Sequence, residues 1–176
     1  MENDGEQKVK QETWNPLEAN PKRLFDYPDL KVLCAEKVEG QFYERKSRRQ
    51  PDELAKTICA FANSNRDKGG LLAIGISDSG EIEGIRNRDD LNVNSILTYH
   101  NYTGAPTEKK IFDCMNNKGQ EDQILLIYVP YLPDRVAETS KGKAYVRNGD
   151  KTVELRDADK RQLEYEKGQI SFEDEI

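Results

Sequence analysis

The sequence predicts an α+β fold: a mixed, mainly antiparallel sheet with two to three helices packed on one face, plus an extended N-terminal arm. Three observations carry this prediction. The run LLAIGIS at 71–77 is apolar on both faces, as in a central strand. Residues 52–62 carry apolar side chains at helical spacing. The apolar runs 110–115 and 123–129 flank Asn117-Lys-Gly119, a pattern typical of a hairpin.

The chain divides by composition into an arm, one domain and a tail. Residues 1–35 are predicted to form the arm, which is partly disordered and lies across a surface of its own protein or of a partner, because scattered apolar residues alternate with prolines. The domain is expected over 36–165. Residues 166–176 form an acidic C-terminal tail.

Local signals place the remaining elements of the domain. Asp52 is a good N-cap for the first helix, which ends at Asn63-Ser-Asn. Asp78-Ser-Gly-Glu81 is a tight turn that brings a short strand back beside 71–77. We further expect strands at 42–47, 82–85, 135–137 and 144–147, and helices at 89–100 and 157–167.

Composition limits the function. The net charge of −6 gives no overall attraction to polyanions, so a nucleic acid would need a local basic patch. Three widely spaced cysteines and one histidine, His100, lack the spacing of a zinc site and fit a reducing compartment. The N-terminus lacks a signal-peptide core, and no apolar run is long enough for a bilayer. We therefore expect a soluble, cytoplasmic protein with no membrane partner.

Two segments resemble the Schlafen-type AlbA domain, a family of nucleic-acid-binding modules. The first is LAKTICAFANSNRDKGGLLAIGISDSGEIEGI, at 54–85. The second is ILLIYVPYLPDRVAETSKGKAYVRNGDKTV, at 124–153, which is similar to the family's proline-ended strand and the Tyr-x-Arg-x-Gly stretch after it. The resemblance covers roughly residues 36–165.

The resemblance also implies a catalytic site. Schlafen endoribonucleases cut tRNA and rRNA with three carboxylates and a divalent metal, in a Glu-x4-Glu-x-Lys pattern followed by an aspartate after a strand. The matching positions here are Glu39, Glu44 and Asp78, with Lys46 as the lysine. By this resemblance the three acids would bind Mg²⁺ or Mn²⁺, which activates water and neutralises phosphate charge, and Lys46 would contact the phosphate.

The residues themselves permit this site. Glu44 and Lys46 share a strand face, and a bend at Gly40 would bring Glu39 back toward them. Asp78 would approach Glu44 if strand 42–47 pairs with strand 71–77. The structural alternatives are that Asp78 caps its own turn and that Glu44 and Lys46 form a solvated pair.

A second group of side chains is basic. Where relatives carry an apolar residue between the second glutamate and the lysine, this chain has Arg45. If the fold gathers the basic residues, they would frame a groove for phosphates; the alternative is a mixed-charge surface. The candidate nucleic-acid ligands are Arg45, Arg48, Arg49, Lys68, Lys141, Lys143 and Arg147.

The sequence leaves three functions open. The first is a metal-dependent endonuclease acting on structured RNA such as tRNA, or on single-stranded DNA. The second is a non-catalytic DNA- or RNA-binding regulatory module. The third is an assembly subunit of a larger nucleoprotein or defence complex, with a protein partner bound through the arm. Because two such lobes pair into a cleft in Schlafen proteins, the single lobe here implies a homodimer.

Overall fold

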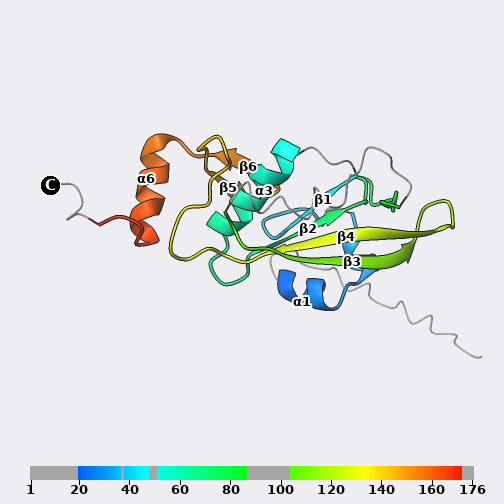
Figure 1. Cartoon of the computed structure of the whole chain (residues 1–176). Coiled ribbons are helices and arrows are strands. Elements are labelled where there is room, and N and C mark those ends of the chain that lie inside the picture. Colours follow the sequence, from blue (N-terminus) through cyan, green and yellow to red (C-terminus); the bar gives the residue numbers. More distant parts are fainter. Residues whose placement is uncertain (1–19, 37, 48–50, 87–103, 172–176) are drawn as a thin grey trace, which may run out of the picture.

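The computed structural model describes residues 20–36, 38–47, 51–86 and 104–171. Its centre is a four-stranded sheet in the order β1-β2-β4-β3 (Figure 1). β2 runs parallel to β1 and antiparallel to β4, and β3 is antiparallel to β4, so the sheet is mixed and the α+β class is confirmed. The strands are β1 (Tyr43–Lys46), β2 (Gly70–Ile74), β3 (Glu108–Met115) and β4 (Glu121–Val129).

The described helices and a small second sheet complete the fold. β5 and β6 form an antiparallel hairpin across the Asn148-Gly149 turn. The helix expected at 89–100 lies outside the described residues. None of the described helices is long and apolar enough to cross a membrane. The elements are α1 (Pro21–Asp26), α2 (Leu30–Leu33), α3 (Pro51–Asn63), β5 (Tyr145–Asn148), β6 (Lys151–Glu154) and α6 (Asp157–Glu166).

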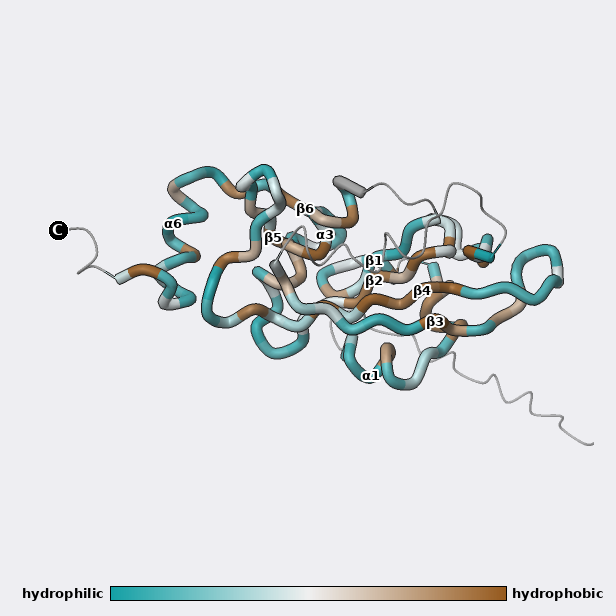
Figure 2. Tube along the Cα trace, viewed as in Figure 1, coloured by the Kyte–Doolittle hydropathy of each residue, from teal (hydrophilic) through white to brown (hydrophobic). Residues whose placement is uncertain are grey.

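The first face of the sheet is covered by α3. Leu54, Ile58 and Phe61 follow one another along the apolar side of this helix and are fully or almost fully buried. They belong to the same core cluster as Leu72 and Ile74, alternate residues of β2. Figure 2 shows this hydrophobic band running along β2, β4 and α3.

The second face is covered by the end of the arm. Phe25 of α1 and Leu33 of α2 are buried with Leu71 and Ala73, which point to the side of β2 opposite Leu72. Asn20 caps α1 by accepting a hydrogen bond from the Arg23 amide, and Asp29 caps α2 in the same way. The arm therefore packs on its own sheet, and the described helices lie on both faces rather than on one.

The strand expected at 82–85 is reduced to one bridge between Ile76 and Ile82. A buried carboxylate explains why the chain turns away: Asp122 of β4 accepts hydrogen bonds from the amides of Ile85 and Arg86, both at 3.0 Å. Gly84, with φ 77°, lies against this carboxylate, and a Cβ there would overlap it. The segment after the turn is thus fixed to β4 instead of continuing along β2.

The Asn63-Ser-Asn65 segment ties the end of α3 to the β5–β6 hairpin and to the loop before β1. The Asn63 side chain donates to the carbonyls of Ala137 and Tyr145, and its Oδ1 accepts from the Ala137 amide. Asn65, in a left-handed conformation with φ 59°, donates to the Gln41 carbonyl. Asn63 and Asn65, which lie in the first of the two segments that resemble the family, therefore have a structural role: they join α3, the β5–β6 hairpin and the loop before β1.

Candidate functional site: a carboxylate cluster and a basic end

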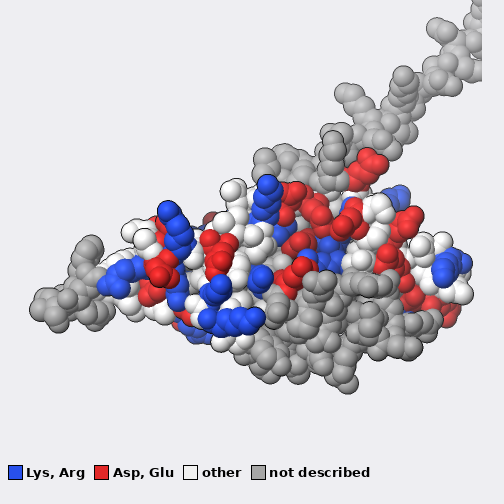
Figure 3. All heavy atoms as spheres, turned by 90° about the horizontal axis from the view of Figure 1, so that it is seen from above, with Lys and Arg blue, Asp and Glu red and all other residues white. Residues whose placement is uncertain are grey.

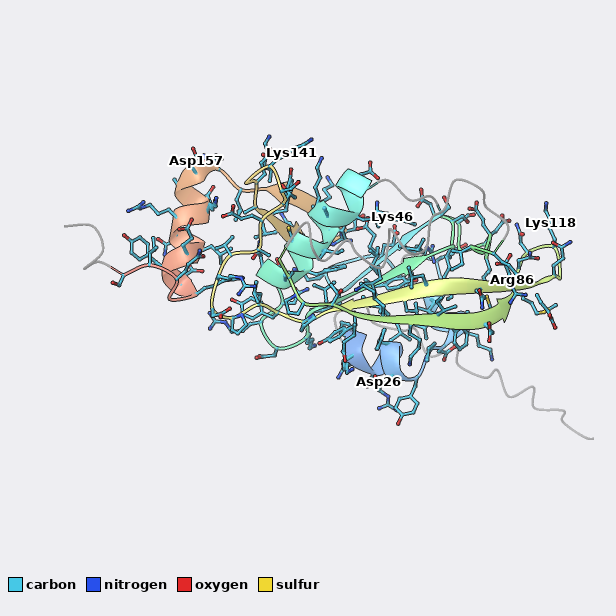
Figure 4. The ribbon with its side chains drawn as sticks, viewed as in Figure 1. Asp26, Lys46, Arg86, Lys118, Lys141 and Asp157 are labelled. Carbon is cyan, nitrogen blue, oxygen red and sulfur yellow. The ribbon has the colours of Figure 1, made fainter. Side chains whose placement is uncertain are left out.

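Glu44 lies in β1, opposite Leu72 of the parallel strand β2. One carboxylate oxygen, Oε2, accepts hydrogen bonds from Arg147 Nη1 at 2.9 Å and from Thr57 Oγ1 at 3.0 Å. The other, Oε1, lies 3.5 Å from the ammonium of Lys46, which is equally close to Glu53. Figure 4 shows Lys46 on the side of the sheet that carries α3. Two cations and a hydroxyl therefore already hold the Glu44 carboxylate.

Arg147 reaches Glu44 from β5, and its side chain is only 1% exposed. Its guanidinium also donates to the Gly40 carbonyl at 3.0 Å and to Thr152 Oγ1 at 3.1 Å. The face of the group lies over Phe61, 5.2 Å from the ring centre. Arg147 was predicted to contact a nucleic acid. In the structure this arginine is buried instead, and it fixes the β5–β6 hairpin to β1 inside the protein.

Arg45 is the second predicted phosphate ligand that lies inside. It is 3% exposed, and its guanidinium donates to the carbonyls of Leu33 at 3.1 Å, Ala35 at 2.8 Å and Asp78 at 2.8 Å. These carbonyls come from the end of α2, the residues after it and the turn after β2. A long side chain with several donors can serve all three, which explains why an arginine fits where the resemblance leads one to expect an apolar residue.

Glu39 returns to the side of β1, as the predicted bend requires. The Gly40 amide donates to the Tyr43 carbonyl at 3.0 Å, and Glu39 Oε1 accepts from the Arg45 amide at 3.0 Å. Burial is the main cause that raises the pKa of Glu39, and the negative charges of Glu44 and Asp78 raise it further. Both other predicted acids are therefore close enough to Glu39 to act on its charge.

Asp78 is exposed in the turn after β2. Asp78 was the residue expected to cap an amide of this turn. At the Glu81 amide the acceptor is instead Ser77 Oγ, at 3.0 Å. Carboxylates are the right chemistry for Mg²⁺ or Mn²⁺. Over the described segments, however, no three acidic, His or Cys side chains are arranged to hold a metal ion. Metal binding by Glu39, Glu44 and Asp78 stays a prediction.

The exposed basic residues gather elsewhere. Lys141 and Lys143 lie in the exposed turn before β5, and Lys143 pairs with Glu154 of β6 at 3.1 Å. Lys160 of α6 donates to the Gly142 carbonyl and pairs with Glu138, and Lys56 of α3 lies over Tyr145. We call Lys56, Lys141, Lys143 and Lys160 the basic end. Figure 3 shows Lys and Arg gathered at this end of the molecule, with acids interleaved.

The other predicted basic ligands are not part of this surface. The Lys68 ammonium lies 5.0 Å from the ring centre of Phe42, at the turn between α3 and β2. Arg48 and Arg49 lie outside the described residues. Sequence reasoning missed Thr57, Lys56 and Lys160, since each gains its role only from a contact with a distant element. The only local signal was that Thr57 and Phe61 are four residues apart on one helix face; Thr57 contacts Glu44 and Phe61 contacts Arg147.

Comparisons with known proteins agree with the fold. A family model described as Schlafen, AlbA_2 matches residues 39–156. Among solved structures, the chain is similar to the DIP2311 protein from Corynebacterium diphtheriae, with a TM-score of 0.50 and 19% sequence identity. That match covers 78% of this chain but only 29% of the other, and at this identity it concerns the fold alone. No curated protein matches the chain.

Proposed function

Because the chain belongs to the Schlafen AlbA_2 family, we propose that it binds nucleic acid, RNA or DNA, and holds it without cutting it. The observation that carries binding is the family match over residues 39–156. The absence of cutting is supported by the Glu44 carboxylate, which is engaged by Arg147, Thr57 and Lys46. A divalent cation that used both Glu44 oxygens would have to displace these partners, and the displaced Arg147 would be left buried without its counter-ion.

The basic end is the surface we assign to the nucleic acid. Lys141 and Lys143 project from an exposed turn, and they can exchange intramolecular contacts for phosphates at small cost, because surface ion pairs contribute little. Phosphate contacts of this kind fix the position of a strand without reading its sequence. We therefore expect binding that is salt-dependent and tolerant of sequence.

The test is fluorescence anisotropy with labelled single-stranded RNA and DNA in EDTA at several salt concentrations. Lys141→Gln is expected to weaken binding severalfold and to reduce the slope of log affinity against log salt by roughly one. Lys118→Gln is the matched control, since Figure 4 places Lys118 at the opposite end of the molecule. Equal effects of the two variants would contradict the assignment of the surface. Absence of binding to either polymer at low salt would contradict the function.

A metal-dependent endonuclease is the second candidate, and one observation favours it. The pKa of Glu39 is raised chiefly by burial and further by Glu44 and Asp78, so a cation at this cluster would relieve their repulsion. The assay is incubation of labelled tRNA and single-stranded DNA with Mn²⁺ or EDTA. Asp78→Asn is preferable to Glu44→Ala, which would unpair Arg147, and Glu81→Gln in the same turn is the control. Cutting that needs Mn²⁺ and is lost only in Asp78→Asn would establish this candidate.

The proposal includes partners and location. By analogy with paired Schlafen lobes, the protein acts as a homodimer in the cytoplasm. A protein partner that docks on the arm would meet the outward side of α1 and α2, where Tyr27 is 77% exposed, because Phe25 and Leu33 are already buried against the sheet. A monomeric mass at concentrations up to about 200 μM would contradict the homodimer.

A further inference from the structure

β3 forms one edge of the central sheet. In the described part of the chain it pairs with β4 alone, along all eight of its residues from Glu108 to Met115. An edge strand presents a row of backbone N–H and C=O groups that can pair with another strand. The opposite edge, β1, has only four residues, and its Tyr43 carbonyl already accepts hydrogen bonds from Gly40 and Arg147. β3 is therefore the longer and more open edge.

Charged side chains commonly protect such an edge, but two of those on β3 are turned toward α1. Lys110 Nζ donates to the Phe25 carbonyl at 2.8 Å, and Glu108 pairs with Lys22 at 2.8 Å. Two apolar side chains stay exposed on this strand, on either side of the exposed Asp113: Ile111 is 46% exposed and Met115 53%. A long unpaired edge with exposed apolar side chains is a surface that another strand can cover.

The side chains of β3 are complementary to a second copy of the same strand. Antiparallel pairing about a twofold axis places one residue opposite itself. With Ile111 on the axis, Lys109 of each copy lies opposite Asp113 of the other, on the same face of the sheet as Ile111. Opposite charges directly across a strand pair are stabilising, and this register contains that pair twice.

Neighbouring registers lack this match. With Phe112 on the axis, Lys109 lies opposite Met115 and Ile111 opposite Asp113, which sets apolar side chains against charges. With Lys110 on the axis, Lys109 lies opposite Ile111, and two lysines meet each other at the centre. Of these three registers, the one centred on Ile111 sets opposite charges directly across on the Ile111 face. On the other face it places Lys110 opposite Phe112, where the Lys110 ammonium is already held by the Phe25 carbonyl.

We propose that β3 pairs with β3 of a second copy about a twofold axis at Ile111, which joins two four-stranded sheets into one continuous sheet. The inference rests on the homodimer of the proposed function and names its surface. It does not require nucleic acid. An interface made by one strand from each copy is small, so the dimer is expected to form at roughly micromolar concentration rather than below it.

The first experiment is a charge exchange, read by sedimentation equilibrium without nucleic acid. Lys109→Asp alone and Asp113→Lys alone each set like charges across the interface twice, and each is expected to raise the dimer dissociation constant by about tenfold or more. Lys109→Asp/Asp113→Lys restores opposite charges and should return the constant to within about threefold of the original. Failure of the double variant to recover, with its fold intact by circular dichroism, would overturn the proposal.

The second experiment tests the register by cross-linking under mild oxidation. Ile111→Cys places the new thiol next to its own copy, and a disulfide-linked dimer is expected. Asp113→Cys is the control: the two copies of residue 113 lie four residues apart along the strands, roughly 13 Å, which is too far for a disulfide. Native Cys114 is farther from its copy, so the unmodified chain should not cross-link through it. Equal cross-linking of both variants would overturn the register.

The remaining outcomes also decide the question. A chain that stays monomeric at about 200 μM would overturn the proposal. A monomer whose β3 amides are protected from hydrogen exchange would also overturn it, because another segment of the same chain would then cover the β3 edge. A dimer that binds no RNA or DNA would overturn the proposed function and leave the β3 interface standing. RNA binding by a chain that never dimerises would overturn the β3 interface and leave nucleic-acid binding standing.

Discussion

Replacing Arg147 by methionine is expected to lower the free energy of unfolding by about 3–5 kcal/mol. The variant keeps a long, flexible side chain over Phe61 but removes the guanidinium. It deletes the hydrogen bond to the Glu44 carboxylate at 2.9 Å, which contributes roughly 1.5–3 kcal/mol because the groups are charged. It also deletes the bonds to the Gly40 carbonyl and Thr152, at about 1 kcal/mol each. The Glu44 carboxylate, 17% exposed, keeps only Thr57 and the more distant Lys46.

The assay is urea unfolding followed by circular dichroism, for Arg147→Met, Glu44→Leu and the double variant. Either single variant leaves a charge without its partner, whereas the double variant removes both charges. The loss of unfolding free energy in the double variant should therefore be smaller than the sum of the two single losses by about 2 kcal/mol or more. Arg156→Met is the control, because the Arg156 side chain is 84% exposed beside Asp159 and such a pair contributes about 0–1 kcal/mol. A cost below about 1 kcal/mol for Arg147→Met, or strict additivity, would refute the reasoning.

Three further variants test separate parts of the structure. The pKa of Glu39 is raised, mainly by burial. The ionised form of Glu39 therefore lowers the stability of the folded state as the pH rises above the ordinary pKa of 4.5. Glu39→Gln should raise the melting temperature at pH 7 but not at pH 4. Burial alone would raise the pKa of Asp122, but donors led by the Arg86 amide outweigh it and lower that pKa. Stability from this carboxylate is present above pH 3.8 and is lost as the pH falls through the lowered pKa. Asp122→Ala should therefore cost about 2–4 kcal/mol at pH 7 in urea unfolding, and this cost should shrink as the pH falls below 3.8. Gly70→Ala would push a Cβ into the Phe61 ring and should cost about 1–3 kcal/mol by the same measurement; an unchanged midpoint would mean that the ring moves freely.

Much of the central sheet could be predicted because its signals are local. The first part of the apolar run at 71–77 lies in β2, which ends at Ile74, and the Asn117-Lys-Gly119 turn joined β3 to β4 as expected. The pairing of β1 with β2, on which the approach of Asp78 to Glu44 depended, is also confirmed. Alternation, helical spacing and turn residues are properties of neighbouring positions, so they can be read from one sequence.

The roles of the basic side chains could not be predicted in this way. Arg45 and Arg147 are both charged and adjacent to plausible phosphate sites in sequence, yet both are buried. Arg147 lies 103 positions from Glu44, and only the complete fold shows that the two form one ion pair. The same reason explains the arm: scattered apolar residues indicate that a surface is covered, but not that Phe25 and Leu33 cover the second face of their own sheet.

The claim that the protein holds nucleic acid without cutting it is tested most directly by the RNA recovered from its complex. Labelled tRNA is incubated with excess protein in Mn²⁺, the retained complex is isolated, and the length of the released RNA is read on a denaturing gel. We predict retained RNA of full length, as in a parallel sample with EDTA. Shortened RNA that appears in Mn²⁺ and disappears with Asp78→Asn would show that the protein cuts RNA with a metal ion at the predicted carboxylates, contrary to this account.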